Sequence, residues 1–228
     1  MRRTRSITAN EALQEGLRYL LGKGVRKSEA KGRAFLVQAA EAGDVKALYL
    51  AHEMLAHGEG GPFDRATAFR YVQRAADLGN LDAIYVLGYY YVTGGMGNIG
   101  YSAEVLNQVR VPKDETRGLE LWKAAAAQGH ALATYRIGEY YEDCSPDNPN
   151  RISLAIEWYE RSIALGEPNG LIRLGDFHIL GKGLPKNHEK ARLLYQRAAE
   201  SDDVCAYTTG KQRLKDFDEL ETTLDENC

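Results

Sequence analysis

Residues 75–93 read AADLGNLDAIYVLGYYYVT, a stretch that holds the end of one predicted helix, a turn and the whole of a second helix. Gly79 supplies the left-handed conformation that commonly ends a helix. The second helix is predicted to run from Asp82 to about Thr93. Two helices joined by so short a turn pack antiparallel. One such pair cannot bury its apolar stripe, so further pairs are expected to stack on it.

The ending Ala-Ala-x-x-Gly recurs along the chain. Clear copies lie at 39–43, 75–79 and 125–129, and weaker copies lie at 162–166 and 198–202. Their closing positions are 36, 50, 37 and 36 residues apart. This spacing indicates a repeat of about 36 residues, with a 14-residue insertion in the third copy because 50 exceeds 36 by 14.

Other positions keep the same register. Eleven residues before each closing position stands a small residue, in the series Gly32, Ala68, Gly118, Ala155 and Ala191. Fifteen before it stand residues that cap helix N-termini, namely Ser28, Asp64, Asp114 and Asn187, with Asn150 as the substitute in the fourth copy. The first helices carry Gly16, Gly88, Gly138 and Gly175 at one shared position, where the second copy has His52. Small residues at these positions are expected to let two helices approach closely.

The sequence therefore predicts an all-α fold, an α-solenoid of about five antiparallel helix pairs with a C-terminal capping helix. The repeats are assigned to residues 1–211, with pairs at about 9–43, 45–79, 81–129 (insertion 97–110), 131–166 and 168–202. Residues 203–228 are predicted to form the capping helix and an acidic tail. Thr8 and Glu11 have the spacing of a capping box and are predicted to start the first helix.

Residues 83–91, AIYVLGYYY, the glycine turn after them and the Ala-Ala-x-x-Gly ending resemble Sel1-like repeats, which are relatives of the tetratricopeptide repeat. The resemblance covers roughly residues 9 to 211. It implies a right-handed superhelix and a protein that recognises partners, because most members of the family are adaptors or regulators in bacteria and eukaryotes. The chain departs from the pattern at Cys144, Ser162 and Ile163 in the fourth copy, and the fifth copy lacks the closing glycine.

Composition narrows the classes of partner. The chain has 29 Lys and Arg against 32 Asp and Glu, a net charge of −3, which gives no general attraction to nucleic acid or to an anionic membrane. Three cysteines are too few and too scattered for a disulfide framework or a zinc knuckle, and they favour a reducing compartment. No apolar run approaches the length of about 18 residues needed to span a membrane. We therefore expect a cytoplasmic protein.

No set of residues predicts catalysis, a cofactor or a metal site. The histidines are scattered, and His178 stands where other copies have tyrosine, which favours a packing role. Cys144 has no neighbouring histidine or basic residue that would lower the pKa of its thiol. The glycine-rich stretch 94–97 lacks the following lysine and the preceding strand of a phosphate loop. Secreted relatives associated with β-lactam binding carry a cysteine pair in each repeat, which this chain lacks.

Partner-binding residues are expected on the first helices of the pairs, which line the concave face of a helix-pair solenoid. The candidates are Tyr49, Glu53, Asp82, Tyr85, Tyr89, Tyr135, Glu139, Glu142 and Asp176. Tyrosine offers a broad apolar area with a hydrogen-bonding tip, and the carboxylates favour a partner segment bearing Lys or Arg. An alternative remains open for Tyr85 and Tyr135, which stand at a tyrosine position of the family and would then only pack between repeats.

The insertion is the second candidate surface, because insertions in repeat arrays map to loops that often lie at the binding face. Its expected contacts are Tyr101, Val105, Leu106 and Arg110. The alternative is that Leu106 and Val109 only pack against a neighbouring helix.

Three functions remain open at this point. The favoured one is a non-enzymatic scaffold or adaptor that binds another protein or a peptide segment, with neither nucleic acid nor membrane as a partner. The second is a neutralising, immunity-type or regulatory protein of a bacterial toxin or secretion system. A remote third is an enzyme such as a β-lactam-binding hydrolase.

Overall fold

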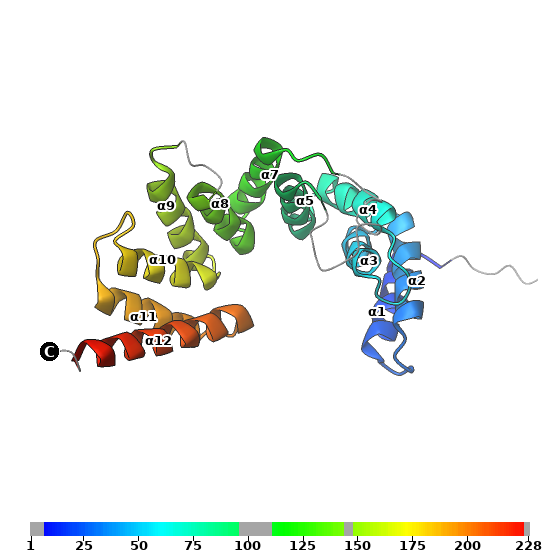
Figure 1. Ribbon diagram of the computed structural model, residues 1–228. Helices are drawn as coiled ribbons and strands as arrows, with labels where there is room; N and C mark the ends of the chain where they lie inside the picture. The colour runs from blue at the N-terminus through cyan, green and yellow to red at the C-terminus, as the bar shows by residue number, and fades with distance from the viewer. Residues whose placement is uncertain (1–6, 96–110, 144–147, 226–228) are drawn as a thin grey trace, which may run out of the picture. The chain divides into compact units, whose positions relative to one another are not determined.

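Figure 1 shows the chain as a computed structural model, which describes residues 7–95, 111–143 and 148–225, with side chains up to residue 219. Within these residues it contains eleven helices and no strand, which confirms the all-α helical repeat fold. The helices are α1 Ala9–Leu21, α2 Glu29–Glu41, α3 Val45–His57, α4 Arg65–Asp77, α5 Leu81–Thr93, α7 Glu115–Ala127, α8 Ala131–Asp143, α9 Arg151–Ala164, α10 Asn169–Leu180, α11 His188–Ala199 and α12 Val204–Asp225.

The chain divides into two compact units, Met1–Ala124 and Ala125–Cys228, and the division falls within α7. In the first unit each helix from α1 to α4 packs on the helix that follows it. In the second unit the same holds from α8 to α11, so that α12 closes that unit against α11.

The predicted caps explain where most helices begin. Ser28, Asp64, Asp114 and Asn187 each accept a hydrogen bond from the backbone N–H three residues on. Thr8 and Glu11 form the predicted capping box. The expectation for Asn150 is wrong: it stands at the N-cap of α9, but its side chain makes no capping hydrogen bond. Its backbone (φ −94°, ψ 6°) departs from the extended conformation from which an N-cap side chain reaches the helix.

The closing glycines end the second helices as predicted. Gly43, Gly79, Gly129 and Gly166 all have positive φ, between 84° and 92°. In the fifth copy, which lacks this glycine, α11 ends at Glu200 with φ −100° and without a left-handed residue. The missing glycine therefore changes the turn after α11, but α12 still follows directly.

In four of the five pairs the first helix crosses its second helix at a glycine. A Cβ atom added to Gly16, Gly88, Gly138 or Gly175 would lie 2.4 to 3.0 Å from a large side chain of the second helix. The facing side chains are Leu36, Trp122, Tyr159 and Tyr195, which share one position of the repeat, seven residues before the close. Any larger residue would overpack these crossings.

In the second copy the large residue lies on the first helix and the small residue on the second helix, the reverse of the other copies. His52 takes the place of the glycine and is only 1% exposed, while Val72 stands where the other copies have the large side chain. The His52 ring thus supplies from α3 the volume that α4 does not supply.

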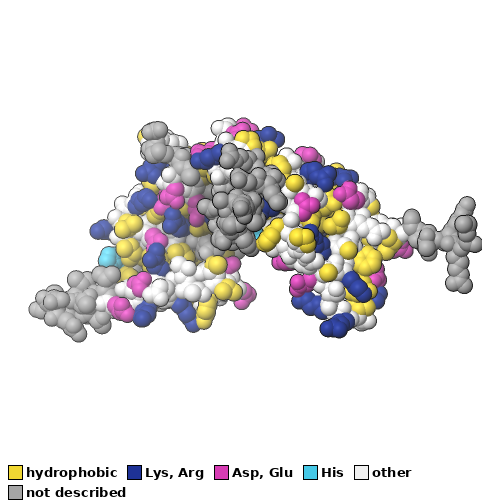
Figure 2. Space-filling view, turned by 45° about the vertical axis from the view of Figure 1, so that its right-hand side comes forward, with side chains coloured by type: hydrophobic (Ala, Val, Ile, Leu, Met, Phe, Trp, Pro, Cys, Tyr) yellow, Lys and Arg dark blue, Asp and Glu magenta, His cyan; other side chains and the backbone are white. Residues whose placement is uncertain are grey.

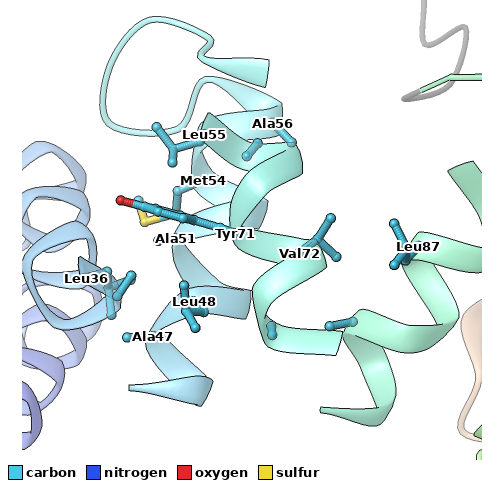
Figure 3. Packing of buried hydrophobic residues seen from close by; sticks show 14 of the residues in the cluster. Leu36, Ala47, Leu48, Ala51, Met54, Leu55, Ala56, Tyr71, Val72 and Leu87 are labelled. Carbon is cyan, nitrogen blue, oxygen red and sulfur yellow. The ribbon is translucent and has the colours of Figure 1, made fainter. Parts of the chain in front are cut away.

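Buried aliphatic side chains complete the core of the first unit. Leu36, Leu48, Val72 and Leu87 come from α2, α3, α4 and α5 respectively, and all four are buried. Figure 3 shows them pointing into the spaces between these helices. Burying one such side chain contributes about 1.5–3 kcal/mol, so the stacking of pairs holds each helix in place.

Candidate functional site

Tyr49 and Glu53 of α3 lie near Asp82 and Tyr85 of α5. Tyr89 follows Tyr85 by one helical turn, and these five predicted residues are here called the α3/α5 surface. Burial raises the pKa of Tyr49 above its ordinary value, and the nearby charges of Glu53 and Asp82 raise it further. Tyr49 and Glu53 stand four residues apart on α3, so their side chains lie on the same face of the helix. The three tyrosines are half-buried and Asp82 is exposed, so the surface combines apolar rings with carboxylates open to a partner.

The buried imidazole of His52 lies beneath this surface. Its Nδ1 lies 3.1 Å from the carbonyl oxygen of Ala68, so Nδ1 carries a proton and donates it. Its Nε2 lies 3.2 Å from the Tyr90 hydroxyl and 3.4 Å from Glu53 Oε1. Hydrogen bonding to His52 lowers the pKa of Glu53, although burial opposes the shift. Nε2 can donate to Glu53 only when the imidazole carries a second proton, so His52 brings the Glu53 carboxylate close to the helix crossing without a permanent hydrogen bond.

The second unit holds a buried carboxylate with two cations. Glu142 of α8 is 6% exposed and accepts hydrogen bonds from Tyr159 Oη (2.7 Å), Arg173 Nη2 (2.7 Å) and Lys182 Nζ (2.8 Å). Burial raises the pKa of Glu142, but the hydrogen bonds from Lys182 and Tyr159 and the charge of Arg173 outweigh it, and the pKa lies below its ordinary value. We call these four residues the Glu142 network.

Other predicted carboxylates of the second unit are also paired. Tyr135 Oη and Arg136 Nη1 both donate to Glu139, at 3.0 and 2.6 Å. Asp176 accepts from Tyr195 Oη at 2.8 Å and from Arg213 Nε at 3.0 Å. The acids of this unit are thus largely neutralised by its own cations.

The structure places the candidates in two groups. Tyr49, Glu53, Asp82, Tyr85 and Tyr89 lie together in the first unit, while Tyr135, Glu139, Glu142 and Asp176 lie on α8 and α10 of the second. The insertion residues Tyr101, Val105, Leu106 and Arg110 lie outside the described residues.

Sequence reasoning missed the cations Arg173, Lys182 and Arg213. Arg173 could have been found by its spacing, because it stands one helical turn before Asp176 and is expected on the same face of α10. Lys182 lies in the turn after that helix and gave no such signal.

The described residues lack the features of metal-binding and membrane-spanning proteins. They hold no cluster of three or more His, Cys, Asp or Glu that could bind a metal ion. None of the described helices is long and apolar enough to cross a membrane. Figure 2 shows side chains of both charges interspersed over the visible face, a pattern that differs from the clustered basic surface of nucleic-acid-binding proteins.

We expect Glu142→Gln to lower the free energy of unfolding by about 2 kcal/mol at neutral pH, because it removes the charge that satisfies two cations. A carboxylate with a lowered pKa stabilises the fold above the ordinary pKa of 4.5 and loses that contribution as the pH falls through its folded value. The difference between the variant and the wild type should therefore shrink as the pH is lowered below 4.5. Urea unfolding followed by circular dichroism at several pH values measures it, and a difference independent of pH contradicts the assignment.

A family model for the Sel1 repeat matches residues 16–44, 47–80, 81–130, 131–167 and 168–203. Among curated relatives, eukaryotic elongation factor 2 kinase of Mus musculus is 27% identical over 177 residues, 65% of this chain and 24% of the kinase. A chitin synthase regulator of Malassezia restricta is 24% identical over 186 residues, 79% of this chain and 12% of that protein. The chain therefore spans only 24% and 12% of the lengths of these two relatives.

Solved structures agree with the repeat assignment. A Sel1 repeat protein from Oxalobacter formigenes superposes with a TM-score of 0.72 at 25% identity, over 90% of this chain and 78% of that one. An immunity protein from Pseudomonas aeruginosa shares the fold, with a TM-score of 0.54 at 15% identity over 96% and 89% of the two chains. Sel1 repeats generally form non-enzymatic scaffolds that mediate protein–protein interaction. Because the family model covers most of its length, the chain belongs to the Sel1 repeat family.

Proposed function

We propose that this chain is a cytoplasmic adaptor that binds a basic segment of a partner protein on the α3/α5 surface. The observation that carries the proposal is the grouping of Tyr49 with Glu53 and Asp82, which brings carboxylates of two helices around half-buried rings. Asp82 is exposed, so a lysine or arginine side chain of a partner can approach its carboxylate. The residues of the insertion, 97–110, are proposed as a second contact with the same partner.

Tyrosine rings and carboxylates both contribute to the binding of a basic segment. A tyrosine ring attracts a cation over its face by about 0.5–1 kcal/mol at an exposed site. Glu53 Oε1 lies 3.4 Å from the buried His52 ring and its side chain is 39% exposed, so the carboxylate is within reach of an incoming cation. Tyr85 and Tyr89 stand one helical turn apart on α5 and provide apolar area beside the carboxylates.

A peptide titration tests the proposal directly. The probe is a capped, fluorescein-labelled peptide, Lys-Lys-Trp-Lys-Lys, titrated with the full chain and followed by fluorescence anisotropy. We expect Glu53→Gln combined with Asp82→Asn to weaken binding about tenfold, or 1.4 kcal/mol. The matched control, Asp77→Asn with Glu157→Gln, removes the same charge from exposed positions of α4 and α9 and should bind as the wild type does. Equal loss in both variants would mean that only net charge matters, and the proposed surface would be abandoned.

A second candidate function is the neutralisation of a toxin, which the shared fold with the Pseudomonas aeruginosa immunity protein favours. The two functions differ in what the partner does when the chain is absent. If the chain neutralises a toxin, that toxin should kill cells from which the chain has been deleted, whereas cells that lose an adaptor should stay viable. Deleting the gene alone and together with its neighbouring genes therefore separates the two functions.

A further inference from the structure

A cavity of about 340 Å³ lies between α10 and α12 of the second unit. Its apolar lining comes from Phe177, Ile179 and Leu180 of α10 and from Phe217 of α12. Phe177 and Phe217 are buried, while Leu180 at the mouth is 64% exposed. The volume is at the lower end of those of ligand pockets and suits one large side chain rather than an extended segment.

Ion pairs of the Glu142 network and of α12 surround this lining. Arg173 and Arg213 line the cavity, and Lys182 Nζ lies 5.0 Å from the centre of the Phe177 ring. In each pair the cation is the exposed member. The side chains of Arg173, Lys182 and Arg213 are 29%, 34% and 43% exposed. Those of their acidic partners, Glu142 and Asp176, are 6% and 19% exposed.

The hydrogen-bonding capacity left over at the rim is mainly that of donors. Glu142 already accepts three hydrogen bonds, and Asp176 accepts from Tyr195 and Arg213. A guanidinium group has five N–H donors and an ammonium group has three. Arg213 uses only its Nε and one Nη on Asp176, and Lys182 makes a single hydrogen bond to Glu142. What a partner meets at this rim is therefore a set of unused cationic donors.

One rim carboxylate has a different environment. Asp216 of α12 lines the cavity and accepts a hydrogen bond from Gln212 Nε2 at 2.7 Å. Its charge repels an acid on the α12 side of the mouth. The acidic groups of a partner are therefore expected away from Asp216, next to Arg173, Lys182 and the Arg213 guanidinium, which reaches over to Asp176 of α10.

We propose that the cavity between α10 and α12 takes one large apolar side chain of an acidic partner segment, whose flanking carboxylates pair with Arg173, Lys182 and Arg213. The apolar side chain gains by leaving water, and the carboxylates complete the unused donors of cations that are already held in position. This site lies in the other unit from the α3/α5 surface and selects the opposite charge, so it stands independently of the function proposed above.

Peptide titrations with the full chain test the site. The probe is a capped, fluorescein-labelled peptide, Glu-Glu-Trp-Glu-Glu, followed by anisotropy up to about 1 mM, the range of weak peptide binding. Its controls are the same peptide with alanine for tryptophan and the lysine peptide used above. Binding should need both the indole and the glutamates, and it should weaken with added salt because part of it is charge pairing.

The chain offers matched variants for this experiment. Leu180→Asp places a repelling charge at the mouth and should weaken binding of the glutamate peptide at least tenfold. Leu21 stands at the same position of the first repeat, ends α1 as Leu180 ends α10, and is 62% exposed, so Leu21→Asp is the control that should leave binding unchanged. Arg213→Gln should weaken binding several-fold, and Arg18→Gln, whose side chain on α1 is 44% exposed and pairs with Glu15, should not.

Three results would overturn the proposal. The glutamate peptide does not bind at all, Leu180→Asp and Leu21→Asp weaken it equally, or Leu180→Asp impairs the lysine peptide instead. Loss of lysine-peptide binding through the α3/α5 surface alone leaves this inference standing, so the two proposals fail separately.

Discussion

Replacing Tyr159 with alanine is expected to lower the free energy of unfolding of the second unit by about 4–5 kcal/mol, at the upper end for a buried aromatic side chain. Tyr159 is fully buried, and its ring centre lies 5.5 Å from that of Tyr135 and 6.0 Å from that of Phe177. It also fills the crossing at Gly138, where the two backbones come close. Alanine would leave a cavity at the junction of α8, α9 and α10, which neighbouring side chains can fill only in part.

The hydroxyl makes a separate contribution. Tyr159→Phe keeps the ring contacts but removes the donor to Glu142, which retains Arg173 and Lys182, so we expect a loss of about 1–2 kcal/mol. Tyr195→Phe is the matched control, because Tyr195 occupies the same repeat position and donates to Asp176, which is more exposed than Glu142. It should lose less, since water can replace the hydroxyl. Urea unfolding followed by circular dichroism measures all three variants, and equal losses for alanine and phenylalanine at 159 would show that the ring packing contributes little.

The regular part of the fold was predictable because it repeats. Gly79 and its equivalents appear at one spacing, so a turn inferred in one copy could be checked in the others. The repeat also gave the N-caps and the crossing glycines, each of which answers a local steric or hydrogen-bonding need. Asn150 was the exception, because its type is right for an N-cap and its backbone conformation is not.

The candidate site was less predictable because its contacts occur once. Arg173 and Lys182 reach Glu142 across 31 and 40 residues of chain, from the following repeat, and no other copy has this arrangement to compare. The tyrosines and acids of α3 and α5 were predicted as one set by mapping the repeat onto a helix-pair solenoid, in which the first helices line one face. The pairing of Arg173 and Lys182 with Glu142 did not follow in this way, because a long side chain can reach partners in several directions.

The lining of the cavity was also not predictable from the sequence. The cavity between α10 and α12 depends on Phe217, which lies beyond the last closing position, where the repeat no longer predicts what a residue faces. Composition marked the C-terminal segment as acidic, but on α12 it is the basic Arg213 that reaches the predicted residue Asp176. A local excess of one charge therefore does not identify which side chain meets the neighbouring helix.

The exchange of His52 and Val72 predicts strong coupling between the two positions. We expect His52→Gly to cost about 3–5 kcal/mol, because it empties a buried site opposite a small side chain and removes a hydrogen-bonding partner of the Tyr90 hydroxyl. Val72→Trp should cost about 1–3 kcal/mol, since the indole would collide with the imidazole that already fills this space. His52→Gly alone leaves the crossing underfilled, whereas Val72→Trp alone overfills it.

Together the two changes rebuild in the second copy the crossing that the third copy already has. There Gly88 faces Trp122, and the indole N–H donates to the Tyr85 carbonyl oxygen at 3.0 Å. The equivalent acceptor in the second copy is the carbonyl of Tyr49, 36 residues earlier. The double variant should therefore be more stable than the sum of the single changes predicts, by about 2 kcal/mol or more for residues in direct contact.

A double-mutant cycle of urea unfolding measures this coupling, with Leu174→Ala as the second site of a control cycle with Val72→Trp, because Leu174 is also buried but lies on α10 of the other unit. Recovery should be incomplete, since the Tyr90 hydroxyl stays buried without the imidazole nitrogen that now lies 3.2 Å away. If the effects of His52→Gly and Val72→Trp simply add, the two positions do not share one volume, and the exchange of sizes between the helices is not what permits a histidine at this crossing.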